Sequence, residues 1–158
     1  MPRWLEHRIP PPVIDLACAA LMWWLAALPP QAQLWPRGGG ALVWAVAIGL
    51  VPLGALVALA GVREFARART TVNPLAPARA RRLVTSGVFA RTRNPMYLGM
   101  LLVLAGWAVW LGNALAWLGL PVFVAVLNVL QIRPEERAMR QRFGDEFERY
   151  AVRVRRWV

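Results

Sequence analysis

The chain has 158 residues, of which 58% are hydrophobic and only 17% are charged, and its formal net charge is +11. The length suggests a single domain. The apolar content excludes a disordered chain, and the single cysteine excludes a disulfide scaffold. Soluble domains are about 45–50% apolar and about 25% charged, so the composition argues against an ordinary soluble domain. The 19 basic residues are all arginine, which raises nucleic-acid binding as a first hypothesis.

Four long apolar stretches predict membrane-spanning helices. A spanning helix needs roughly 20 residues. The second and fourth stretches meet that length, whereas the first and third have 16 residues each and require extension into the interface or a locally thinned bilayer. We therefore expect an all-α integral membrane protein in which residues 1–158 form one domain, with spans at residues 13–28, 41–62, 96–111 and 114–132.

The first stretch also has features of a signal peptide. Arg3 and Arg8 precede its apolar core, as in the n-region of such a peptide. The segment before the core is long, however, and Pro29-Pro30 makes a poor cleavage site, so a spanning helix is favoured.

The arginines lie almost entirely on one side of the expected spans. Four spans place the N-terminus, the loop 63–95 and the tail 133–158 on the same side, and these segments hold 18 of the 19 arginines, all except Arg37. This positive-inside pattern predicts that both termini are cytoplasmic, and we expect a bacterial inner-membrane protein. Anionic headgroups attract such clusters, and no zinc-finger or RNA-binding motif accompanies them. Membrane lipids are therefore the expected partners, and nucleic acid is not.

The segments outside the spans have their own signals. Gly112 and Asn113 alone separate the third and fourth spans and predict a tight helical hairpin. Pro134 marks the expected start of a tail helix, with a possible break near Phe143-Gly144. Apolar residues recur three or four apart in that tail, so we expect an amphipathic helix on the membrane face or over the middle loop: Met139, Phe143, Phe147, Tyr150, Val154 and Trp157.

Polar residues that could do chemistry gather in segments 70–97 and 132–150, which flank the short hairpin and should meet at one membrane face. Asn94-Pro95 begins a helix whose amides could hold an anion, and Glu135 stands beside Arg133 at the start of the tail. These groups suit a zwitterionic or phosphate-bearing ligand. In the alternative interpretation the arginines are topology anchors, Asn94 is a helix cap, and the two glutamates complement a helix dipole. One histidine and one cysteine supply no metal site of ordinary spacing.

Two motifs resemble those of a known family. LVTSGVFARTRNPMYLG at residues 83–99, then PEER and FGDEFERYAVRVRRW in the tail, are similar to the isoprenylcysteine carboxyl methyltransferase family, whose pattern the phospholipid methyltransferases share. The resemblance covers roughly residues 70–157. It implies S-adenosylmethionine as cofactor, bound between the loop 63–95 and the tail 133–158. By position it implies that these residues line the cofactor: Arg81, Arg82, Leu83, Val84, Phe89, Asn94, Pro95, Met96, Tyr97 and Glu135.

The chain departs from the family pattern at two positions. Asn94 stands where eukaryotic members have histidine, so any role that needs an imidazole is absent. Gln131 stands at the position of a substrate-orienting arginine, and Arg133 is the nearest guanidinium. We therefore expect Arg133, in place of the family's arginine, to orient the substrate, and Glu135 to hold the cofactor's polar groups; these two are the expected catalytic residues.

The function expected from these features is S-adenosylmethionine-dependent methyl transfer to a lipophilic acceptor, either a small molecule or a lipidated substrate, through a carboxylate, an amine or a thiol. An NADPH-dependent reductase related to the membrane sterol reductases is an alternative, although those enzymes have more spans. A non-catalytic protein that binds lipid or a partner is the third possibility.

Overall fold

The computed structural model describes residues 9–28, 32–69 and 82–158. Within these ranges the chain is helical, apart from loops and one isolated bridge between Gln33 and Asn113. The α-helices are α1 (Pro11–Ala26), α2 (Ala41–Arg67), α3 (Pro95–Leu111), α4 (Gly119–Leu127), α5 (Arg133–Phe143) and α6 (Asp145–Arg153). Three short turns join them: the 3₁₀ turns η4 (Gly87–Ala90) and η5 (Ala114–Leu118), and the π turn η6 (Asn128–Ile132).

All four predicted apolar stretches are helical. In the described part of the chain, two helices are long and apolar enough to cross a membrane: α2, and the continuous helix Ala114–Phe143, which contains η5, α4, η6 and α5. The other two, α1 and α3, are shorter apolar helices of 16 and 17 residues. The second stretch extends five residues beyond the predicted end at residue 62, because its charged C-terminal turn stays helical through Arg67.

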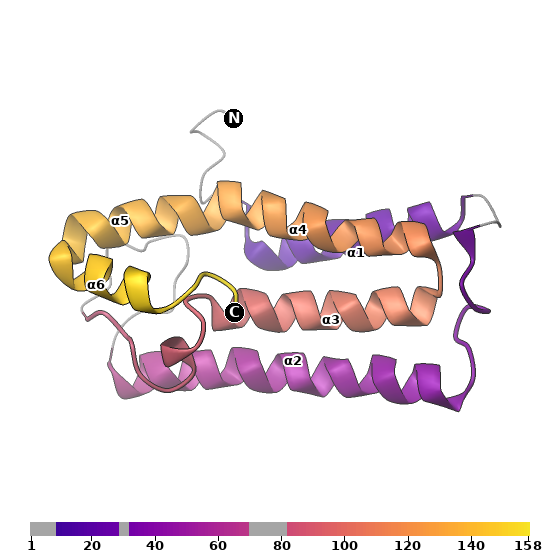
Figure 1. Cartoon of the computed structure of the whole chain (residues 1–158), viewed down its shortest axis with the longest axis horizontal. Coiled ribbons are helices and arrows are strands. Elements are labelled where there is room, and N and C mark those ends of the chain that lie inside the picture. Colours follow the sequence, from indigo (N-terminus) through magenta and orange to yellow (C-terminus); the bar gives the residue numbers. More distant parts are fainter. Residues whose placement is uncertain (1–8, 29–31, 70–81) are drawn as a thin grey trace.

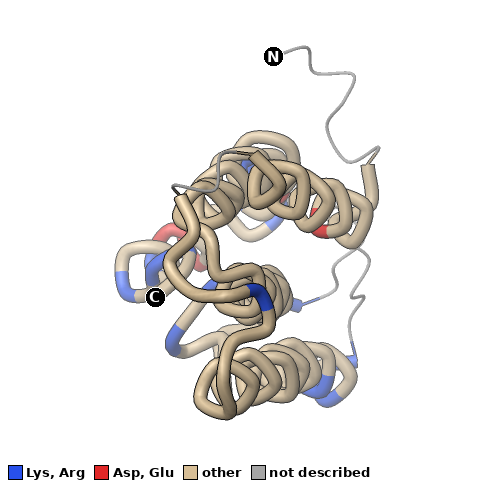
Figure 2. Tube along the Cα trace, turned by 90° about the vertical axis from the view of Figure 1, so that its right-hand side faces the viewer, with Lys and Arg blue, Asp and Glu red and all other residues tan. Residues whose placement is uncertain are grey.

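The helices form three layers with α3 in the middle (Figure 1). On one side α3 packs against α2, and on the other side lie α1 and α4. Figure 2, which looks along the helices, shows the same order. The face of α2 that points away from α3 is apolar and exposed, with Leu42 and Leu56 among its side chains. Such a face fits lipid rather than water.

Small residues bring α2 and α3 into close contact. Gly54 of α2 and Gly99 of α3 face each other so closely that a Cβ on either would collide with the partner's carbonyl oxygen. At Gly61 a Cβ would lie 2.9 Å from Cγ of Pro95. Small residues allow this approach, which matters in lipid because helix association there depends on contact packing.

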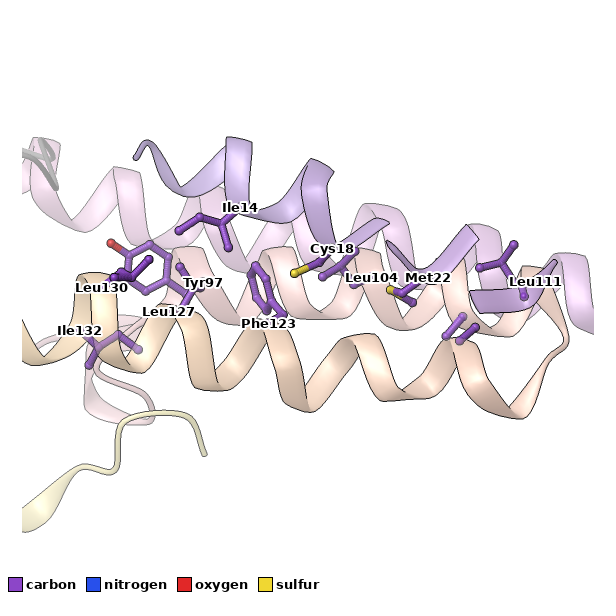
Figure 3. Close-up of a cluster of buried hydrophobic side chains, with 13 residues drawn as sticks. Ile14, Cys18, Met22, Tyr97, Leu104, Leu111, Phe123, Leu127, Leu130 and Ile132 are labelled. Carbon is purple, nitrogen blue, oxygen red and sulfur yellow. The ribbon is translucent and has the colours of Figure 1, made fainter. Parts of the chain in front are cut away.

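The core lies between α1, α3 and α4 (Figure 3). From α1 come Ile14, Cys18 and Met22, spaced four apart so that one face points inward, and they meet Leu104 of α3 and Phe123 of α4. Cys18 is a buried free thiol in this cluster and acts as an apolar filler.

The hairpin turn is confirmed at residues 112–113. Gly112 adopts φ +64°, and the side chain of Asn113 accepts a hydrogen bond from the backbone N–H of Leu115 at 2.9 Å. The loop from α1 to α2 lies against this turn, because Leu34 N–H donates to the carbonyl of Gly112 at 2.7 Å. Next to the turn, Trp107 and Trp110 stack at 5.1 Å between ring centroids, and Trp23 of α1 stacks on both.

No new helix begins at Pro134, contrary to the expectation from its position. The helix runs on from α4 through η6 into α5, and residues 132 and 133 keep right-handed helical angles. A proline inside an α-helix removes a hydrogen bond and clashes with the carbonyl four residues earlier. The wider π turn directly before Pro134 relieves that clash, so the long helix is not broken.

The predicted break at Gly144 is confirmed, and it turns the tail back on the bundle. Gly144 has φ +49° and separates α5 from α6. Both helices present their apolar stripe to the loop before α3, where Phe147, Tyr150 and Val154 are buried together with Leu83. Of the two predicted positions for the amphipathic tail, the structure therefore shows the one over the middle loop.

Candidate functional site

The start of α3 and the start of α5 lie side by side and bring two predicted site residues together. Tyr97 is buried in the first turn of α3, and its hydroxyl donates a 2.5 Å hydrogen bond to Oε1 of Glu135. The apolar part of the long helix ends at Ile132, so Glu135 lies just beyond it. A carboxylate and a phenol from opposite ends of the family-like motif therefore meet at the end of the apolar bundle.

Among the described residues no cation pairs with Glu135, so its protonation depends mainly on burial and on its neighbours. Burial raises the pKa of Glu135 to about 8; the hydrogen bond from Tyr97 lowers the pKa in part, and the charge of Glu136 raises it further. A carboxyl group with a pKa this far above its ordinary value is typical of a functional site, although structural networks produce such shifts too.

Glu136, the next residue, has the opposite environment. Its carboxylate is buried, with Arg156 as a bidentate partner at 2.8 and 2.7 Å, Arg93 at 3.1 Å and Arg140 at 3.8 Å. Burial alone would raise the pKa of Glu136, but the hydrogen bond from Arg156 and the charges of the three arginines hold it below its ordinary value. This residue stays ionised and joins α5 to the C-terminal residues.

Asn94 occupies the N-cap position of α3, as the alternative interpretation predicts, but its side chain makes no cap hydrogen bond. Its amide Nδ2 instead donates to the backbone carbonyl of Arg156 at 2.8 Å. The hydroxyl of Thr92 donates to the same carbonyl at 3.2 Å, and the N–H of Arg93 donates to the carbonyl of Arg155 at 3.0 Å. Residues 92–94 are therefore tied to the C-terminal end of the chain.

The predicted loop residues Leu83, Val84 and Phe89 lie under the tail. Val84 and Phe89 are buried, and Leu83 packs with the apolar stripe of α5 and α6. The ring of Phe89 meets Phe65 of α2 edge to face at 5.0 Å, and its carbonyl accepts a 2.8 Å hydrogen bond from the hydroxyl of Tyr150. These three residues are the apolar side of the loop against which the tail packs.

The remaining predicted residues differ in position. Pro95 is buried against Gly61 of α2, and Met96 lies beside it. Arg82 and Arg133 are exposed on the surface, and neither makes an ion pair with another described residue. Arg81 lies outside the described residues.

Sequence reasoning missed several residues that hold this region together: Glu64, Arg93, Glu136 as an ionic centre, Tyr150 and Arg156. Glu64 accepts a 2.7 Å hydrogen bond from the hydroxyl of Ser86 and so ties α2 to the loop. The arginines carry no distinguishing signal, because nothing in a set of 19 like residues marks the two that turn inward. The sequence did offer one clue to the separate role of Glu136. Adjacent residues of a helix point about 100° apart, so Glu135 and Glu136 were bound to face different neighbours.

The polar groups here fit the chemistry of S-adenosylmethionine, which carries a carboxylate, an ammonium, hydroxyls and a sulfonium. The indole Nε1 of Trp157 and Nε and Nη1 of Arg93 are buried donors without a hydrogen-bond partner among the described residues. Glu135, which accepts the hydrogen bond from Tyr97, adds a buried acceptor at the start of α5. Unpaired buried donors are costly and are usually satisfied by a ligand or water. Among the described residues no group of three histidine, cysteine or carboxylate side chains could hold a metal.

The architecture first defines a class: an apolar helical bundle of membrane type with a polar site at one end. Residues 42–146 match the phospholipid methyltransferase family, and the chain belongs to that family. The matched region runs from α2 into α6, so it contains both Tyr97 and Glu135. The family belongs to the isoprenylcysteine carboxyl methyltransferase-like group, which confirms the resemblance and indicates a membrane methyltransferase.

A protein of Haemophilus influenzae described as uncharacterized is 52% identical over 63 residues, which make up 40% of this chain and all of that protein. No solved structure matches the chain.

Proposed function

We propose that the protein transfers a methyl group from S-adenosylmethionine to a lipophilic acceptor at the cytoplasmic face of a bacterial inner membrane. The observation that carries the proposal is the Tyr97–Glu135 hydrogen bond, which joins the start of α3 to α5 inside the family-matched region. The end of the bundle with this pair adjoins lipid, so an apolar acceptor can approach without crossing water.

The residues of this chain would act by holding and orienting. Glu135, once ionised, accepts hydrogen bonds or pairs with a positive group of the cofactor, and Tyr97 fixes the direction of its carboxylate. The exposed guanidinium of Arg133, two residues earlier on the same helix, would hold an anionic group of the acceptor. When bound, S-adenosylmethionine supplies an electrophilic methyl group on a sulfonium, so alignment and exclusion of water matter more than proton transfer.

The orientation follows from charge. Of the 19 arginines, 18 belong to segments that four spans would place on one side, and the site lies between two of these segments. We therefore infer that both termini, the site and its membrane-lipid contacts face the cytoplasm.

The test uses full-length protein purified in detergent, with thermal unfolding measured alone, with S-adenosylhomocysteine and with NADPH. Stabilisation by S-adenosylhomocysteine alone is expected, because a ligand that binds only the folded state raises its melting temperature. Stabilisation by NADPH alone would instead favour the reductase, and stabilisation by neither would favour a non-catalytic protein.

A matched pair of variants assigns the binding to Glu135. In Glu135→Gln we expect a loss of S-adenosylhomocysteine affinity of about tenfold or more in calorimetry, since one charge-assisted interaction is removed. Glu146→Gln makes the same change at an exposed position of α6 and should bind as the wild type does. Equal affinities in the two variants would rule out the role given to Glu135.

A further inference from the structure

The carboxylate of Glu136 joins three segments of the chain directly and a fourth, α6, through Arg140. Glu136 on α5 pairs with Arg156 near the C-terminus, with Arg93 before α3, and with Arg140 one turn along its own helix. Arg140 in turn pairs with Glu148 of α6 at 2.7 Å. The side chains of Glu136 and Arg93 are only 7% and 12% exposed, so these two charges are largely withdrawn from water.

The last residues of the chain, 155–157, form what we name the C-terminal strap. The strap lies beside the start of α3 (Figure 1), where its backbone carbonyls accept hydrogen bonds from Arg93, Thr92 and Asn94. Trp157 packs against the same core cluster that includes Tyr97 and Ile132. The strap is therefore fastened to residues 92–94, directly before the helix that carries Tyr97.

Positive charges outnumber negative charges around Glu136, so the cluster of arginines depends on the carboxylate of Glu136 for its stability. Three arginines surround a single carboxylate, and Arg93 and Arg156 repel each other. Without the negative charge, two partly buried guanidinium groups would face each other with no compensation, which strongly favours separation. Loss of Glu136 should release the strap first, since Arg156 is the more exposed of the two.

We propose that Glu136 is a positioning residue for the cofactor site: it fastens the C-terminal strap across the start of α3 and thereby fixes Asn94, Trp157 and the Tyr97–Glu135 pair. Glu136 itself does not touch the cofactor. The two adjacent glutamates then have different roles: Glu135 binds the ligand, and Glu136 holds the C-terminal strap in place beside it. This inference rests on the proposed function for the ligand and on the structure alone for the strap.

The experiment has two arms, carried out on the full chain in detergent. Trypsin treatment followed by mass spectrometry measures how fast the peptide bonds after Arg155 and Arg156 are cut, and needs no ligand. Calorimetry with S-adenosylhomocysteine, at a temperature where every variant is folded, measures affinity. In Glu136→Gln we expect faster cleavage in the strap and affinity weaker by about tenfold, the scale of coupling between residues in one network.

Glu148→Gln is the matched control. It removes the same charge from the same network at the Arg140–Glu148 pair, which is exposed and does not touch the strap. It should be cleaved and should bind as the wild type does. Arg156→Gln is a second variant, used if Glu136→Gln does not fold, because it keeps Glu136 paired with Arg93 and Arg140. Trypsin no longer cuts after residue 156 in this variant, so its cleavage is compared with the wild type at the bond after Arg155 alone; we expect faster cleavage there and weaker affinity.

The outcomes separate the two halves of the inference. Unchanged strap cleavage in both strap variants would overturn the role of Glu136 as its anchor. Faster cleavage with unchanged affinity would overturn the positioning role, because the strap would then be structural only. If the wild type does not bind S-adenosylhomocysteine, the proposed function fails and the positioning role fails with it, while the cleavage rates still decide whether Glu136 holds the strap.

Discussion

The two ends of α3 are built from different interactions. At the turn end, residues 112–113, a positive-φ glycine, backbone hydrogen bonds and stacked tryptophans hold the chain with neutral groups. At the other end, Tyr97 donates to the buried Glu135, Asn94 donates to the backbone carbonyl of Arg156, and Arg93 pairs with the buried Glu136. Contacts between neutral groups are complete without a ligand and respond little to pH. Buried charged groups, by contrast, can bind a ligand and change with pH. The comparison indicates that substitutions at the turn end will change stability, and those at the site end will change ligand binding.

The largest effect is expected for Gly112→Val at the turn end. Gly112 has φ +64°, and a Cβ there would lie 2.6 Å from the carbonyl oxygen of Trp35. Strain and overpacking together should lower the free energy of unfolding by about 3 kcal/mol, seen in thermal unfolding in detergent. Gly49→Ala, at a position with nothing within 4 Å, should not destabilise the protein. Equal melting temperatures for the two variants would contradict this account of the turn.

A smaller loss is expected for Trp107→Phe. The indole Nε1 of Trp107 donates to the carbonyl of Ala19 at 3.1 Å and links α3 to α1. Phenylalanine keeps a ring in the stack but not the donor, so about 1 kcal/mol of stability should be lost, with ligand affinity unchanged. Trp24→Phe, on the exposed face of α1, is the control and should unfold as the wild type does. A fall in S-adenosylhomocysteine affinity in Trp107→Phe would contradict the view that the turn end affects stability and not ligand binding.

The smallest effect on stability, less than about 1 kcal/mol, is expected for Tyr97→Phe at the site end, but this variant should change the pH response. The raised pKa of Glu135 means that the folded protein binds this proton more tightly than the unfolded chain, so stability from this group falls as pH rises from about 4.5 to about 8. A ligand that needs the carboxylate binds more tightly over the same rise.

The hydrogen bond from Tyr97 lowers the pKa of Glu135, so its removal should move the midpoint of pH-dependent S-adenosylhomocysteine binding upward. Calorimetry at a series of pH values measures this midpoint. Tyr150→Phe, which loses a hydrogen bond to Phe89 instead, should leave it in place. A midpoint that is the same in Tyr97→Phe as in the wild type would show that Glu135 does not control binding.

The helices and the turn were predictable because local composition decides them. Apolar runs define α1 to α4, Gly112-Asn113 can form only a short connection, and Gly144 interrupts the tail where its conformational freedom is needed. The pairing of the two motif segments was also predictable, since a short hairpin returns the chain to the same end of the bundle.

The roles of individual side chains were not predictable to the same degree. Whether Pro134 starts a helix or lies within one depends on the π turn at residues 128–132, and no residue type there predicts such a turn. Asn94 bonds to a carbonyl near the C-terminus, 62 residues away, and such a partner is set by tertiary packing rather than by local sequence. Glu135 and Glu136 are identical in sequence terms, and only the helix rotation gives them different neighbours.

That rotation depends on the π turn at Asn128–Ile132. A π turn accommodates one residue more than the α-helical path over the same span, so everything after it is shifted in phase by one position, or about 100°. A chain lacking one residue here could therefore run as an unbroken α-helix and still present both carboxylates to the same neighbours. A deletion between the π turn and Glu135 would instead leave the π turn in place and rotate Glu135 by about 100°, away from Tyr97. We therefore expect this helix to tolerate the loss of one residue within Asn128–Ile132.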